Sequence, residues 1–181
     1  MKFLKYALLA STLIFASCSD DDDNAPDPVN EEEVITTLNV ILDAGDSEVT
    51  LSYQDLSGDG STEIIDVSGQ LLPNTTYMGY ITLLNETEDP AENITLEVEE
   101  EDDEHQFFYT VGSDLNVALD YANFDGDGNP LGTQFTLDTG SASSGELTFT
   151  LIHEPNKPNT GLENAGGETD IQVTFDITVG E

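Results

Sequence analysis

The chain has 181 residues, and its 38 acidic residues against three basic ones give a formal net charge of −35 at pH 7. So few basic side chains exclude a nucleic-acid-binding surface, because nothing could neutralise the phosphates. The single cysteine excludes an intramolecular disulfide. Such acidity is typical of a solvated surface, or of one that attracts cations.

The start of the chain has the pattern of a bacterial lipoprotein signal peptide. Lys2 and Lys5 precede an apolar run over residues 7–16, and small residues stand directly before Cys18. We therefore predict a signal peptide over residues 1–17 and a lipid anchor on Cys18, which would attach the protein to a membrane. An ordinary secretory signal with a chance cysteine is the alternative.

Residues 18–33 are rich in acids and prolines, and we predict that they form a lipid-anchored flexible linker. The aspartates at positions 20–23 resemble the export signal of Bacteroidetes-type lipoproteins that reach the outer face of the outer membrane. The expected location is therefore the cell surface, with the periplasmic face of the outer membrane as the alternative.

Residues 34–181 are predicted to form one domain, in which apolar and polar side chains alternate as in half-buried strands. Many short strands without a βαβ rhythm favour a single immunoglobulin-like antiparallel sandwich of about nine strands. A lipocalin-like β-barrel is the alternative. The predicted strands lie at residues 34–42, 49–53, 63–67, 76–84, 105–111, 115–121, 131–137, 147–153 and 171–179.

One segment suggests a helix. A short acidic helix is predicted near residues 90–103, with Asp89 as its cap and Pro90 at its first position. Residues 94–98 also alternate as a strand would, so a strand is the alternative for this segment.

Two histidines at predicted strand ends are candidate metal ligands. His105 follows Glu104, and His153 precedes Glu154. Two imidazoles and a carboxylate would suit zinc, copper or a similar divalent ion if the strand ends meet. Nothing in the sequence shows that they meet, and histidines bonded only to their neighbours are the alternative.

A second candidate is a calcium loop with oxygen ligands at Asp125, Asp127 and Asn129. It is not an EF-hand, because Pro130 and Thr136 stand where glycine and glutamate are needed. Asp-Gly pairs are also common in plain turns, which is the other interpretation.

Catalytic motifs are missing from the sequence. No nucleophile elbow surrounds a serine, no glycine-rich phosphate loop opens a helix, and the only thiol is the predicted lipidation site, Cys18. We therefore expect a monomeric protein without enzymatic activity.

Several segments resemble a family of small, uncharacterised Bacteroidetes-type (flavobacterial-like) surface lipoproteins. They are the signal with its aspartates and residues 30–37, 84–109, 153–158 and 166–170. Some members carry the label of a type 1 periplasmic-binding fold, which this strand pattern and chain length contradict. The resemblance implies work beside a TonB-dependent outer-membrane receptor.

The expected function is therefore a non-enzymatic binding module that captures a metal ion or a small nutrient beside such a transporter. A structural or adhesion sandwich that contacts glycans or partner proteins is the alternative. A divalent cation is the only cofactor that the sequence suggests.

Overall fold

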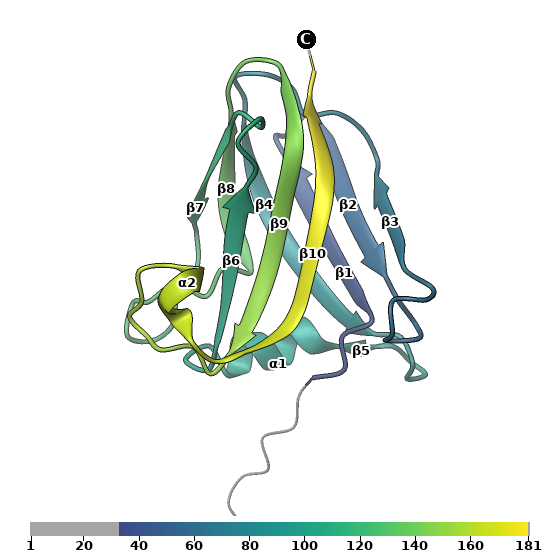
Figure 1. Ribbon diagram of the computed structural model, residues 1–181, viewed down its shortest axis with the longest axis vertical. Coiled ribbons are helices and arrows are strands. Elements are labelled where there is room, and N and C mark those ends of the chain that lie inside the picture. The colour runs from purple at the N-terminus through teal and green to yellow at the C-terminus, as the bar shows by residue number, and fades with distance from the viewer. Residues whose placement is uncertain (1–32, 181) are drawn as a thin grey trace, which may run out of the picture. The chain divides into compact units, whose positions relative to one another are not determined.

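The computed structural model describes residues 33–180. The predicted signal, the lipidation site Cys18 and the predicted linker up to residue 32 lie outside the described residues. Within them, two antiparallel sheets pack face to face (Figure 1). The prediction of a single antiparallel β-sandwich is confirmed, and the sheets do not close into the alternative barrel.

The larger sheet has the strand order β3-β2-β1-β4-β8-β7, with the short β5 paired to β4. Each of its neighbouring pairs is antiparallel, and β4 is central, as its length and apolar content suggest. Its strands are β1 (Thr37–Asp43), β2 (Glu48–Gln54), β3 (Ile64–Val67), β4 (Thr76–Asn85), β5 (Glu92–Asn93), β7 (Val117–Tyr121) and β8 (Gln134–Thr139).

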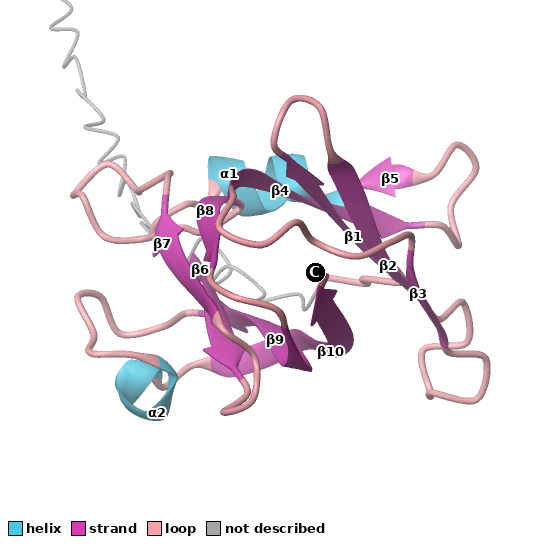
Figure 2. Cartoon of the chain, turned by 90° about the horizontal axis from the view of Figure 1, so that it is seen from above, coloured by secondary structure: helices cyan, strands magenta, loops and turns pink. Residues whose placement is uncertain are grey.

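The smaller sheet has the order β10-β9-β6. It contains β6 (His105–Val111), β9 (Ser143–His153) and β10 (Glu168–Val179). Seen from above, it faces the larger sheet, and its strands are labelled in Figure 2. Its ladder is regular except for one register shift in β10, between Thr169 and Ile171.

The predicted acidic helix exists as α1 (Ile94–Glu100), but its N-cap is not the predicted Asp89. The side chain of Asn93, not Asp89, accepts a hydrogen bond from the Thr95 N–H at 3.1 Å. Asn93 is still paired with β4 as part of β5, so the chain stays extended up to that residue. The helix therefore begins four residues later than the Asp-Pro pair predicts.

Large side chains from both sheets fill the space between them. Phe107, Phe149 and Phe175 come from the smaller sheet, Tyr77 and Phe135 come from the larger one, and all five are fully buried. Their alternation with exposed residues produces the period-two pattern from which the strands were predicted. A second helix, α2 (Leu162–Ala165), covers the outer face of the smaller sheet through the buried Ala165.

No helix among residues 33–180 combines the length and the apolar character needed to cross a bilayer. Figure 1 shows α1 at the end of the sandwich where β1 begins, β6 begins and β9 ends. The residues of the candidate site gather at this end.

Candidate metal centre

The two histidines meet because of strand register. His105 opens β6 and His153 closes β9, and the two residues are direct partners in the antiparallel ladder. Side chains at opposed positions share one face of a sheet. Their rings stack with centroids 4.7 Å apart and planes inclined by 22°.

A β-bulge brings a carboxylate to this pair. Gln172, Thr174 and Asp176 alternate outward along β10, and an unbroken strand would turn Asp170 outward with them. The register shift between Thr169 and Ile171 breaks this alternation at Asp170. The Asp170 side chain is only 1% exposed and lies beside both imidazoles.

The fourth residue is Glu33, which we assigned to the flexible linker. The structure places its carboxylate beside both imidazoles. Glu33 precedes β1 of the larger sheet, and its side chain is 4% exposed. The centre therefore joins the start of the larger sheet to three strand ends of the smaller one.

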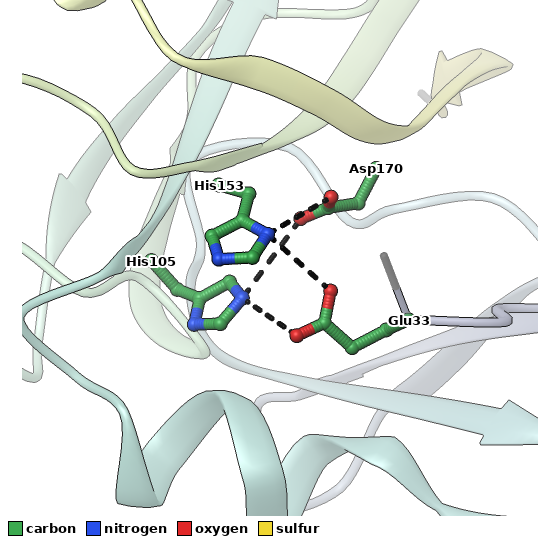
Figure 3. A group of neighbouring side chains, drawn as sticks. All are labelled: Glu33, His105, His153 and Asp170. Atoms are coloured by element: carbon green, nitrogen blue, oxygen red, sulfur yellow. Dashed lines mark ion pairs between the residues drawn. The ribbon is translucent and has the colours of Figure 1, made fainter. Parts of the chain in front are cut away.

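Figure 3 shows one nitrogen of each imidazole turned toward the two carboxylates. His105 Nε2 lies 3.2 Å from Glu33 Oε1 and 4.0 Å from Asp170 Oδ2. His153 Nδ1 lies 3.7 Å from Glu33 Oε2 and 3.9 Å from Asp170 Oδ1. One ligand atom from each residue lies within 4.8 Å of those of the other three.

A backbone carbonyl sets the tautomer of His105. Its Nδ1 lies 3.2 Å from the carbonyl oxygen of Glu101, which can only accept a hydrogen bond, so Nδ1 carries the proton. In the neutral ring, Nε2 then presents a lone pair to Glu33 Oε1, which is also an acceptor. Two acceptors this close repel each other unless a proton or a metal ion lies between them.

The charge around the centre is negative. Each carboxylate carries a negative charge when ionised, and burying two of them without a counter-charge is costly. Glu97 on α1 lies close by, and its pKa is raised by burial first and then by the charges of Glu33, Glu101 and Glu92, whereas His105 opposes this rise. A divalent cation would neutralise the centre.

The predicted ligands Glu104 and Glu154 are not the carboxylates that face both histidines. Both are exposed, and with His153 alone they form a second group whose ligand atoms lie within 4.8 Å of one another. The carboxylates nearest His105 Nε2 come instead from Glu33 and Asp170.

The predicted calcium loop is organised by protein donors. The Asp125 carboxylate accepts hydrogen bonds from the backbone N–H groups of Asp127 and Asn129 at 3.0 and 2.8 Å. It also pairs with the Lys157 ammonium at 3.3 Å. Burial raises the pKa of Asp125, but the hydrogen bonds from Asn129 and Lys157 outweigh it, so the pKa is lowered. These contacts explain the loop as a turn that is stabilised by hydrogen bonds within it and by the Lys157 ammonium.

Only weak signals in the sequence pointed to Glu33 and Asp170. Glu33 ends a run of three glutamates, none distinguishable from the others. Asp170 follows Gly166 and Gly167, whose left-handed φ angles of 65° and 71° mark an irregular approach to the last strand. That glycine pair was the only feature of the sequence that indicated a register shift in β10.

No protein-family model, curated protein or solved structure matches the chain. The assignment of the centre therefore rests on its own residues and their geometry.

Proposed function

We propose that this protein binds one divalent transition-metal ion, zinc foremost, between Glu33, His105, His153 and Asp170. The observation that carries the proposal is the buried contact between two acceptors, His105 Nε2 and Glu33 Oε1. No lysine or arginine neutralises the centre, because the single described lysine, Lys157, bonds to Asp125 and to the Asp102 carbonyl.

The types of ligand narrow the class of ion. Imidazole nitrogens argue against calcium and magnesium, which prefer oxygen ligands throughout. Without a thiolate or thioether the set does not favour copper(I), whereas two imidazoles with two carboxylates suit zinc and its neighbours. Four protein ligands in a buried site are typical of a closed zinc site, because catalytic zinc keeps a position open.

The spacing of the ligands also suits zinc. Bonds of about 2.0–2.2 Å in a tetrahedron place neighbouring ligand atoms about 3.3–3.6 Å apart. The four nitrogen–oxygen distances of the centre run from 3.2 to 4.0 Å. These distances involve both oxygens of each carboxylate, and one ligand atom per residue lies within 4.8 Å of the other three, so the side chains would move closer together around the ion.

The proposal also includes the location of the protein in the cell. We infer a lipoprotein anchored through Cys18 at the outer membrane that captures the ion beside a TonB-dependent receptor. The signal pattern and the family resemblance support this inference. A short anchored stalk would raise the local concentration of the captured ion near such a partner.

Calorimetric titration of the purified, chelator-treated protein with zinc, copper(II), nickel, manganese and calcium tests the binding. We expect one zinc per chain and no calcium binding. Asp170→Asn should weaken zinc binding by more than about tenfold, or 1.4 kcal/mol. Asp127→Asn, a matched change at an exposed loop acid, should leave it unchanged. Absence of heat and of a thermal shift with every ion would remove the proposal.

A second candidate function rests on a groove of about 540 Å³ between β6, β7 and the loop that contains α2. Leu119, Tyr121 and Leu162 are among its lining residues. The half-buried Tyr121 ring packs against Tyr109 with centroids 5.1 Å apart, and its hydroxyl donates to the Phe107 carbonyl at 2.9 Å. Aromatic rings of this kind stack on sugars, and a glycan array tests this adhesion function.

A further inference from the structure

We propose that the metal ion reaches the buried centre through an outer site formed by Glu104, Glu154 and His153. This inference rests on the proposed function, because it concerns how the same ion is loaded and released. It gives a role to the two glutamates that the centre itself does not use.

The centre needs a route to solvent. Its four side chains are between 0 and 5% exposed, so a hydrated ion cannot reach all of them at once. His105 is fully covered, whereas His153 is the more exposed of the two imidazoles, at 5%. Exchange with solvent is therefore expected on the His153 side.

His153 belongs to two ligand groups. It contributes one atom to the group with Glu33, His105 and Asp170, and one to the exposed group with Glu104 and Glu154. An ion that replaces one of its waters with His153 at the outer site is then already bound to a residue that is also a ligand of the buried centre. As the ion moves inward, it exchanges the two outer carboxylates for those of Glu33 and Asp170, gains His105 and stays beside the His153 ring.

The backbone explains why both glutamates gather at this imidazole. Glu104 and Glu154 flank the His105–His153 pair, and the Glu154 N–H donates to the Glu104 carbonyl at 2.6 Å. A regular strand would turn Glu154 to the face opposite His153. Glu154 instead has a φ of 49°, which breaks that alternation directly after His153.

Another acidic hollow lies nearby but lacks the shared ligand. It measures about 420 Å³ and is lined by Glu92, Glu97, Glu100 and Glu101 of β5, α1 and the turn after it. It contains carboxylates but no imidazole. Neutralising two of its carboxylates therefore provides a control with an equal change of charge close to the same centre.

Stopped-flow kinetics with zinc alone, followed by competition with a fluorescent zinc indicator, test the route. Glu104→Gln with Glu154→Gln should lower the association and dissociation rates together, each by about tenfold, because the ion loses its first carboxylate partners. The equilibrium dissociation constant should change less than about threefold, since the inner ligands remain. Glu92→Gln with Glu100→Gln should leave both rates near those of the wild type.

Three results would overturn the route. Equal slowing by both double variants would show a general effect of charge, and stronger slowing by the control would place the route at the other hollow. A weakened equilibrium affinity with an unchanged dissociation rate would mean that Glu104 and Glu154 act only by attraction from a distance. If the wild type binds no zinc in calorimetry, the proposed function fails before the route is tested.

Discussion

Lys157 carries the only ammonium side chain among residues 33–180. Its ammonium donates to the Asp102 carbonyl at 2.5 Å and to Asp125 at 3.3 Å. Its side chain is 6% exposed, and that of Asp125 is 1% exposed. One cation therefore ties the loop after β9 to the turn after α1 and to the loop after β7.

Replacement of this lysine should destabilise the protein in a pH-dependent way. Lys157→Met removes a charged hydrogen bond from Asp125 and should lower the free energy of unfolding at pH 7 by about 1.5–3 kcal/mol. The folded-state pKa of Asp125 is lowered, so its stabilising effect is present above the ordinary aspartate pKa of about 3.9 and is lost as the pH falls through the lowered value.

Urea unfolding at pH 7 and pH 3 measures this difference. The gap between the wild type and the variant should be largest at pH 7 and smaller at pH 3. Glu163→Gln, an exposed acid in the same loop, serves as the control and should change stability by less than about 0.5 kcal/mol. A gap of equal size at both pH values would contradict the role given to Asp125.

At the level of single residues, the sequence predicted two of the four proposed ligands. His105 and His153 were identified as candidate metal ligands because both stand at predicted strand ends beside acidic residues. The partnership of Glu33 and Asp170 could not be predicted, because it depends on which two strand ends meet in space and on a bulge. Glutamate and aspartate are too frequent in this chain for their presence to be informative.

Among the elements, the corner at Gly166 and Gly167, which leads into β10, controls the geometry of the centre. Gly167 has a φ of 71°, and a Cβ added there would lie 2.1 Å from the carbonyl oxygen of His153. That oxygen belongs to the backbone of a proposed ligand, so it cannot move away without moving the imidazole. The corner therefore has no room for a side chain.

Gly167→Ala should lower the free energy of unfolding by at least about 3 kcal/mol and weaken zinc binding. Gly58→Ala is the matched control, because Gly58 has a φ of 68° but open space around it. It should cost only the left-handed backbone strain of about 1–2 kcal/mol and leave zinc affinity unchanged. Urea unfolding and zinc titration give both quantities, and equal effects of the two variants would refute the steric argument.

The strands were predictable because one face of each lies in the core, which imposes alternation on the sequence. The strand from His105 to Val111 has the predicted bounds. The start of α1 was not predictable from its local signal, since the pairing of Asn93 with β4 overrides the favourable Asp89-Pro90 start. The four-residue α2 lies in a predicted loop and is too short to produce a helical period.

For the whole molecule, the net charge of −35 is the dominant electrostatic feature. Like charges spread over a compact domain repel one another, and the unfolded chain relieves that repulsion by expanding. Neutralisation at a buried metal centre removes only a small part of it. Stability should therefore depend on the salt concentration of the solution.

The melting temperature should rise by at least about 3 °C between about 0.01 M and 1 M sodium chloride, where the Debye length falls from about 30 Å to about 3 Å. A chelator in every sample keeps trace metal from contributing. Calorimetric scans measure the shift. A melting temperature that is independent of salt would show that the acidic groups are spaced widely enough not to repel.

The four proposed ligands are also far apart along the chain. Glu33 precedes the first strand of one sheet, and Asp170 lies in the last strand of the other. No single hairpin contains the centre. Its four ligands come together only when the longest stretches of chain between them are closed into loops. An ion would then bind only to chains in which both sheets have already packed, and a chain exported in unfolded form would acquire its ion after export, from the compartment in which it folds.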